Sequence, residues 1–113
     1  MNRWIGAAGL SVCACLLLPQ GVSAQSRIPS LSSTWGNLDI TQDACTRKAR
    51  QTLERYRYRR IELVGSTTFG DRSDYQIGIR CVAEKGIYYI FGGGPEEPVI
   101  RRYIDELKGD FEK

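Results

Sequence analysis

The sequence has 113 residues, which is enough for one domain with a modest core. Its 16 basic and 13 acidic residues give a formal net charge of +3, too small to indicate nucleic-acid binding by itself. Histidine is absent, so the usual acid or base near neutral pH and the usual nitrogen ligand of metals are both missing. We therefore expect no metal site and no cofactor.

The N-terminal segment predicts a secretory signal peptide over residues 1–24. Arg3 precedes an almost wholly apolar run over residues 4–18, and small residues favour cleavage after Ala24. We expect a periplasmic or secreted protein without a transmembrane segment once the signal is removed. Two alternatives stay open, an uncleaved membrane anchor and lipoprotein processing at Cys15, which would leave three leucines directly after the lipid-bearing residue.

The four cysteines predict one disulfide. Cys13 and Cys15 leave with the signal peptide, and Cys45 and Cys81 remain in the mature chain. Two thiols in a small exported protein indicate a structural bridge, which would contribute roughly 4 kcal/mol for a loop of this length. A redox-active pair would need closely spaced cysteines, which these two are not.

After the signal peptide, residues 25–38 are rich in serine and predict a flexible lead-in. Asp39 or Thr41 can then cap a helix that runs to about Tyr58. One stripe of this helix carries its apolar or small residues, and it includes Cys45. The stripe consists of Cys45, Ala49, Thr52, Leu53 and Tyr56.

Three strands are expected next. Residues 61–64 form a short first strand, and residues 65–72 form a polar turn. The stretch 73–83 alternates at period two and predicts a half-buried central strand, with Cys81 as the last inward residue. A hairpin at Glu84, Lys85 and Gly86 leads to a third strand over residues 87–91.

Residues 92–95, three glycines and a proline, are expected to end the third strand and to act as a flexible connector. A final amphipathic helix should begin near Pro98. The predicted fold is a single α+β domain over residues 39–113 with the order α-β-β-β-α. Its three strands form an antiparallel meander, and both helices pack on one face of it.

This order is similar to the topology of the double-stranded RNA-binding domain. That family contacts the RNA backbone with a lysine-rich start to its second helix, whereas this chain has Glu96 and Glu97 there. We therefore expect no nucleic-acid binding.

The chain also resembles a loosely defined group of small secreted bacterial proteins. These share a signal peptide, a cysteine early in the first helix and a second cysteine late in the middle strand. The resemblance is carried by Cys45, Ala49, Cys81, Gly86 and Gly92. It implies an exported location and this layout.

A basic cluster around the end of the first helix is the most suggestive candidate site. Arginines that alternate with Tyr56 and Tyr58 can contact phosphates and stack on bases, although a solvated helix face has the same composition. The possible anion-binding residues are Arg47, Arg50, Arg55, Arg57, Arg59 and Arg60.

The third strand is apolar on both faces and indicates a second candidate surface. Ile87, Tyr89 and Phe91 share one face, and Tyr88 and Ile90 share the other. One face must belong to the core, and we place the possible partner surface at Tyr88 and Ile90.

Catalytic chemistry has few candidates, so we expect a protein that is not an enzyme. The carboxylate pairs lie in expected polar turns, where water prevents the formation of a general acid. We expect a non-catalytic module that binds a macromolecule outside the cytoplasm, either a protein or an anionic glycan or lipid. The remaining alternative is a small hydrolase that uses Asp71 and Asp74.

Overall fold

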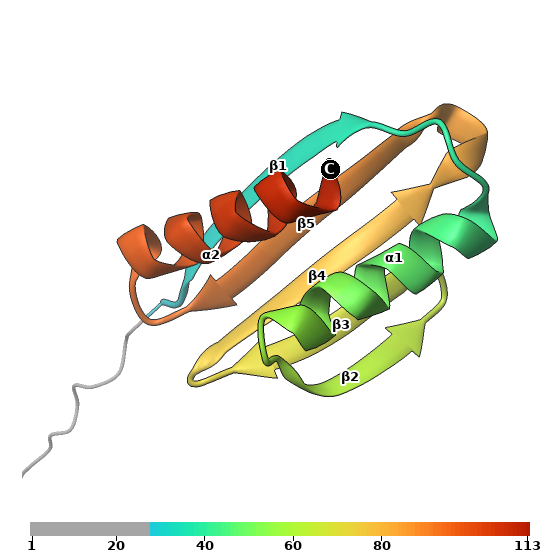
Figure 1. The fold of residues 1–113 in the computed structure, drawn as a ribbon. Helices are drawn as coiled ribbons and strands as arrows, with labels where there is room; N and C mark the ends of the chain where they lie inside the picture. Colours follow the sequence, from blue (N-terminus) through green and yellow to red (C-terminus); the bar gives the residue numbers. More distant parts are fainter. Residues whose placement is uncertain (1–27) are drawn as a thin grey trace, which may run out of the picture.

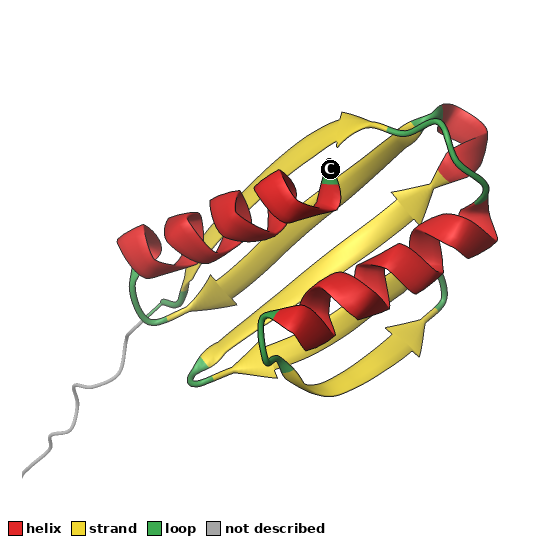
Figure 2. Cartoon of the chain, viewed as in Figure 1, coloured by secondary structure: helices red, strands yellow, loops and turns green. Residues whose placement is uncertain are grey.

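The structure is a computed structural model that describes residues 28–113, so the expected signal peptide lies outside the described residues. They form one five-stranded antiparallel sheet with both helices on the same face (Figures 1 and 2). The elements in chain order are β1 (Ser30–Asn37), α1 (Gln42–Arg55), β2 (Arg59–Val64), β3 (Thr67–Arg72), β4 (Tyr75–Val82), a 3-10 turn (Ala83–Lys85), β5 (Ile87–Gly94) and α2 (Glu97–Phe111). None of the helices within these residues is long and apolar enough to cross a membrane.

The predicted α+β class and the placement of both helices on one face are confirmed, but the sheet is larger than predicted. Its strand order is β1-β5-β4-β3-β2. The strands β2 to β5 form a meander, and β1 adds to the edge at β5. The three-stranded prediction missed β1 and β3, so the likeness to the double-stranded RNA-binding domain does not cover the whole sheet.

β1 lies where a flexible lead-in was expected, and that prediction is wrong for residues 30–37. The inner side of this strand carries small residues, and its apolar residues Leu31 and Trp35 are exposed on the other side. The usual hydrophobic alternation is therefore inverted. Gly36 is required by close packing, because a Cβ atom there would come within 2.6 Å of the Tyr88 ring.

β3 lies where a polar turn was expected. Its composition is polar, yet Thr67 and Thr68 are buried between the neighbouring strands β2 and β4. Backbone pairing on both sides stabilises this strand without a run of large apolar side chains.

The triple glycine does not break the third predicted strand, because β5 continues to Gly94. Gly92 and Gly94 both face neighbouring side chains that fill the space of a Cβ atom. At Gly92 that atom would come within 2.8 Å of the Gln76 carbonyl oxygen and would overlap Ile77, and at Gly94 it would overlap the Tyr75 ring. These glycines are close-packed parts of the sheet.

α1 begins as expected and ends a turn early. Thr41 is the cap, since its hydroxyl oxygen accepts a hydrogen bond from the Ala44 N–H at 3.1 Å. The helix ends at Arg55 because Arg57 adopts a left-handed φ of 65°, which turns the chain into β2.

The predicted disulfide joins Cys45 on α1 to Cys81 on β4, with a Cα–Cα distance of 6.0 Å. The two cysteines are 36 residues apart and both are buried. Gln42 reinforces the junction, because its amide nitrogen donates to the Cys81 carbonyl at 2.8 Å and its amide oxygen accepts from the Ala83 N–H at 3.0 Å.

The core lies between the helices and the inner face of the sheet. α2 begins at Glu97, with Pro98 in its first turn as predicted. α2 lies over β1 and β5, and α1 lies over β2, β3 and β4 (Figure 1). The buried hydrophobic residues are Cys45, Ala49, Leu53, Tyr58, Tyr75, Ile77, Ile79, Cys81, Tyr88, Ile90, Ile100, Ile104, Leu107 and Phe111.

Candidate interaction surface

The sheet has an inner face, which the two helices cover, and an outer face, which neither helix covers (Figure 1). Because side chains alternate along a strand, every second residue of each strand lies on the outer face. The strand register then aligns these outward residues in rows that run across the sheet.

One row brings together Trp35 on β1, Tyr89 on β5 and Arg80 on β4. Tyr89 is the direct cross-strand partner of both Trp35 and Arg80. Trp35 is 59% exposed and Tyr89 is 40% exposed, although both are large and partly apolar. Among residues 28–113, Arg80 forms no ion pair with a carboxylate. We call Trp35, Tyr89 and Arg80 the aromatic row.

The next row contains two phenylalanines on either side of a glycine. Phe91 on β5 and Phe69 on β3 are both cross-strand partners of Gly78 on β4. Their rings meet edge to face, with centroids 6.1 Å apart. A Cβ atom on Gly78 would come within 2.6 Å of the Phe91 ring, so glycine allows the two rings to meet over the middle strand.

A hollow of about 950 Å³ lies beside these rows, where Gly93 brings no side chain to the outer face. Leu31 and Phe91 form its apolar wall, and Asp71 and Gln76 contribute to a polar wall. The sheet therefore presents an aromatic surface next to a depression that has one apolar and one polar side.

The hollow's polar lining includes Arg60, Asp71 and Asp74, and among residues 28–113 only Asp71 of these two carboxylates forms an ion pair. Arg60 contacts the Asp71 carboxylate at 2.7 Å, and the Gln76 side-chain amide donates to the other oxygen of Asp71 at 3.2 Å. Both oxygens of the Asp71 carboxylate thus have a partner within the protein. The predicted hydrolytic pair of Asp71 and Asp74 gains no support from this arrangement.

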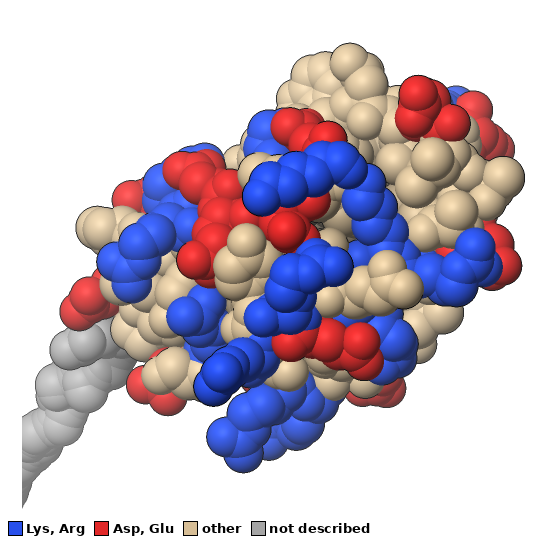
Figure 3. Space-filling view, in the orientation of Figure 1, with Lys and Arg blue, Asp and Glu red and all other residues tan. Residues whose placement is uncertain are grey.

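The predicted basic cluster does not form a single patch. Arg60 lies with the hollow, whereas Arg47 and Arg50 lie on α1 beside acidic residues of the same helix. Figure 3 shows basic and acidic side chains interspersed over the helical side of the molecule.

Most of these arginines are paired with carboxylates. Arg47 contacts Asp43 at 2.8 Å, Arg50 contacts Glu54 at 3.9 Å, and Arg55 contacts Asp110 of α2. Such exposed pairs add little stability, but they reduce the positive potential that an anionic ligand would meet. In the described part of the chain, Arg57 and Arg59 form no ion pair.

The partner surface predicted at Tyr88 and Ile90 is wrong. Both side chains are buried against the helices, with 1% and 0% of their surface exposed. The predicted grouping of Tyr89 with Phe91 is confirmed, and it is this side of β5 that faces outward. The sequence shows the two faces of the strand but not which of them the helices cover.

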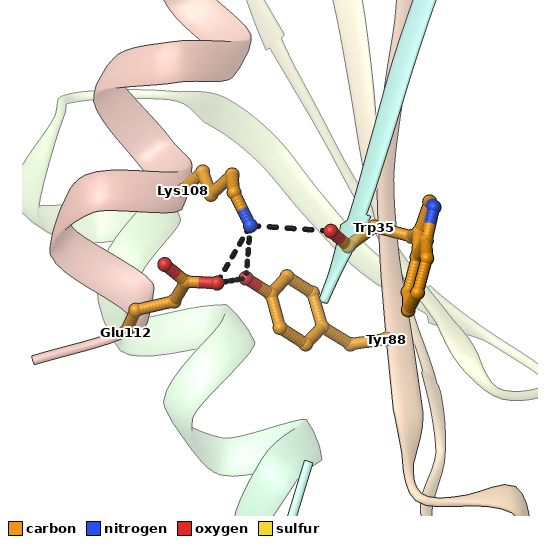
Figure 4. A network of polar contacts seen from close by, with 4 residues as sticks. All are labelled: Trp35, Tyr88, Lys108 and Glu112. Carbon is orange, nitrogen blue, oxygen red and sulfur yellow. Dashed lines mark hydrogen bonds and ion pairs between the residues drawn. The ribbon is translucent and has the colours of Figure 1, made fainter. Parts of the chain in front are cut away.

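Tyr88 instead belongs to a polar network that joins α2 to β1 (Figure 4). Its hydroxyl donates to the Glu112 carboxylate. The Lys108 ammonium donates to Glu112 at 2.6 Å, to the Tyr88 oxygen at 3.2 Å and to the Trp35 carbonyl at 3.1 Å. The last turn of α2 is thereby tied to the first strand.

Burial raises the pKa of Tyr88 to about 12, and the hydrogen bond to Glu112 acts in the same direction. The hydrogen bond between Lys108 and Glu112 raises the pKa of the lysine and lowers that of the glutamate. Burial likewise raises the pKa of Tyr58 to about 12, against the opposing effect of Arg72. Both phenols therefore lose their proton at a higher pH than a free tyrosine.

Sequence reasoning missed Trp35 as a surface residue, because a tryptophan near a domain edge more often packs at the rim of the core. It also left Phe69 undecided between covering the core and making exposed contacts. The signal that could have placed Trp35 is its spacing from Leu31, which is even and therefore puts both on one face of a strand. Within residues 28–113, no group of three or more acidic or cysteine side chains could hold a metal ion.

In comparisons with known proteins, no family model and no curated protein matches this sequence. The function is therefore inferred from the geometry of the outer face.

Proposed function

We propose that the protein is a non-catalytic module that binds a partner protein through the outer face of its sheet. The observation that carries the proposal is the aromatic row, in which Trp35, Tyr89 and Arg80 lie side by side on three adjacent strands. Tryptophan, tyrosine and arginine are the residues that most often dominate the binding energy of protein interfaces.

The row also supplies apolar surface that a partner can bury. Trp35 and Tyr89 are about half exposed, and burying the exposed part of such a side chain gains roughly 2–3 kcal/mol. The neighbouring hollow can accept one protruding side chain, and Leu31 and Phe91 form its apolar wall. Hot-spot residues lie near the centre of an interface, in well-packed sites from which the surrounding contacts exclude water.

The non-catalytic part of the proposal rests on the pairing of polar groups. Asp71 is held by Arg60 and Gln76, and the Tyr88 hydroxyl is held by Glu112 and Lys108. A catalytic group must be free to exchange a proton or attack a substrate, and these groups are engaged in structural contacts. A hydrolytic or redox activity that survives purification of the protein to homogeneity would contradict the proposal.

The proposal can be tested with a photo-crosslinking residue. p-Benzoylphenylalanine at position 89 should cross-link a discrete protein partner in the cells that produce this chain. The same residue at position 50, on the outward side of α1, is the control and should not. The purified partner should then bind the wild-type protein in calorimetry, and Trp35→Ala with Tyr89→Ala should weaken this binding at least tenfold.

Identical cross-links from positions 89 and 50, or affinity that is unchanged by the double substitution, would refute the outer face as the binding site. The mature protein would be used in its oxidised form, since the disulfide joins α1 to the middle of the sheet.

An anionic glycan or lipid is the second candidate partner, and the absence of ion pairs at Arg57 and Arg59 in the described chain favours it. Binding of this kind weakens steeply with salt. Elution from heparin well above physiological salt, lost in a variant with Arg50→Glu, Arg57→Glu and Arg59→Glu, would establish it. We expect weak retention that the substitutions hardly change, because most of the cluster is paired.

A further inference from the structure

The two edges of the sheet differ in how they are protected against pairing with another strand. β2 forms one edge and carries Arg59, Arg60 and Glu62. Its register shifts between Arg59 and Glu62, and Arg60 adopts a left-handed φ of 51°. Charges and a bulge on an edge strand are the devices by which proteins prevent edge-to-edge association.

β1 forms the other edge and has none of these devices. Its eight residues, Ser30–Asn37, contain neither a charged side chain nor a proline. They pair with β5 in an unbroken register from one end to the other. A regular edge strand of this length presents a row of backbone donors and acceptors that can accept a further strand.

The hydrogen bonds identify which backbone groups face the free edge. The Leu38 N–H donates to the Gly86 carbonyl at 2.8 Å and continues the ladder between β1 and β5. Residues alternate along an antiparallel strand, so Leu31, Ser33 and Trp35 direct their N–H and carbonyl groups away from β5. The contact of Lys108 with the Trp35 carbonyl agrees with this assignment.

We propose that β1 pairs with β1 of a second copy of this protein, so that two five-stranded sheets join into one across a two-fold axis. Antiparallel pairing centred on Ser33 places Ser33 opposite its own copy and Leu31 opposite Trp35 of the partner subunit. The residues that face each other are then Leu31, Ser33 and Trp35, whose N–H and carbonyl groups point away from β5 toward the free edge. An antiparallel hydrogen-bonded pair requires this arrangement. The strand is thus complementary to itself.

Two features favour a second copy as the partner: the exposed apolar side chains of β1 and the distance that the pairing would set between the two α2 helices. Leu31 and Trp35 are 75% and 59% exposed on the outer face, and pairing puts them in cross-strand contact twice in the dimer. α2 lies over the junction of β1 and β5, so the two α2 helices would run side by side roughly 10 Å apart, a distance at which helices pack. A carbonyl oxygen accepts two hydrogen bonds, so Lys108 does not block the Trp35 carbonyl.

Sedimentation equilibrium of the purified, oxidised protein tests this pairing. We expect the mass to rise from that of a monomer to that of a dimer as the concentration increases through the micromolar range. Ser33→Pro should keep the protein monomeric, because it removes an N–H that faces the free edge and no hydrogen bond to β5. Ser33→Ala keeps that N–H and serves as the matched control that still dimerises.

A charge exchange at the same position provides a test that does not depend on tolerance of proline. Ser33→Lys and Ser33→Glu should each be monomeric alone, because like charges would lie directly opposite each other. An equimolar mixture of the two should restore the dimer mass. A protein that stays monomeric at all concentrations, or a dimer that all three substitutions leave intact, would overturn the proposal.

Discussion

The inner and outer faces of the sheet are built from the same five strands, yet they differ in what their side chains contact. On the inner face, the disulfide, Tyr88 and the closely packed Gly92 all contact helices or neighbouring strands. On the outer face, Trp35 and Tyr89 remain half exposed. The core therefore lies on the inner face, whereas the outer face combines packed rings at Phe69 and Phe91 with large side chains that remain exposed to solvent.

Removal of the disulfide from the inner face should lower the free energy of unfolding more than any other change considered. Cys45→Ser combined with Cys81→Ser should lower the free energy of unfolding by about 4 kcal/mol, because it releases a loop of 36 residues in the unfolded chain. Urea denaturation monitored by circular dichroism measures the change. A loss below about 1 kcal/mol would mean that packing, rather than the bridge, holds α1 on the sheet.

The second-largest loss of stability is expected from substitution of Gly92 in β5. Gly92→Ala should lower stability by roughly 1–3 kcal/mol, because the new methyl group would overlap Ile77 and approach the Gln76 carbonyl. Gly109→Ala in α2 is the matched control, since nothing lies within 4 Å of its Cβ position. The control should raise stability by about 0.5–1 kcal/mol, as expected inside a helix. Equal effects of both substitutions would contradict the close packing of β5.

A smaller effect is expected from the polar network around Tyr88. Tyr88→Phe removes a hydroxyl that contacts Glu112 and Lys108, and it should lower stability by about 1 kcal/mol at neutral pH. Tyr89→Phe, one residue along on the outer face, should change stability by less than about 0.5 kcal/mol.

The dependence of stability on pH also distinguishes the buried Tyr88 from the exposed Tyr89. The pKa of Tyr88 is raised from 10.0 to about 12, so the unfolded chain loses the phenol proton first as the pH rises. This contribution to stability is complete below pH 10 and is lost between about pH 10 and 12. Denaturation midpoints should therefore fall less steeply in this range for Tyr88→Phe than for Tyr89→Phe. Identical slopes would show that Tyr88 titrates normally.

The smallest effect on stability is expected on the outer face. Trp35→Ser with Tyr89→Ser should change the free energy of unfolding by less than about 1 kcal/mol, since neither side chain is part of the core. The same variant should lose binding to the partner captured at position 89. A loss of several kcal/mol would instead place the aromatic row among the residues that hold the fold together.

The sequence predicted those parts of the fold that follow strong periodicity. The stripes of α1 and α2 and the alternation of β4 followed from it, whereas the pairing of Cys45 with Cys81 followed from the count of cysteines left after the expected signal peptide. These elements bury large apolar side chains on one side, and this is the pattern that hydrophobic periodicity detects.

The missed elements lack that pattern for physical reasons. β1 buries small residues and exposes Leu31 and Trp35, and β3 is held by backbone pairing around Thr67 and Thr68. The glycines of β5 were interpreted as a break because three glycines and a proline are typical of a strand end. Their packing partners, Tyr75 and Ile77, come from another strand. Local sequence contains no information about contacts of that kind.

The candidate surface could not be predicted because it also depends on contacts between elements that are distant in the sequence. Both sides of β5 are apolar in the sequence, and only the position of α2 shows that Tyr88 is internal and Tyr89 external. The row that joins Trp35 to Tyr89 exists only through the pairing of β1 with β5, which the prediction of a flexible lead-in excluded.

The network at the end of α2 also determines how the molecule responds to mechanical force. β1 begins at Ser30 beside Gly94, whereas α2 ends near the opposite end of β1, where Glu112 reaches Tyr88. A force that pulls the two ends of the described chain apart therefore acts along β1 and shears it against β5. All the hydrogen bonds of that ladder then bear load together instead of opening one by one, so we expect this domain to resist stretching along β1 better than peeling of β1 from the edge of the sheet.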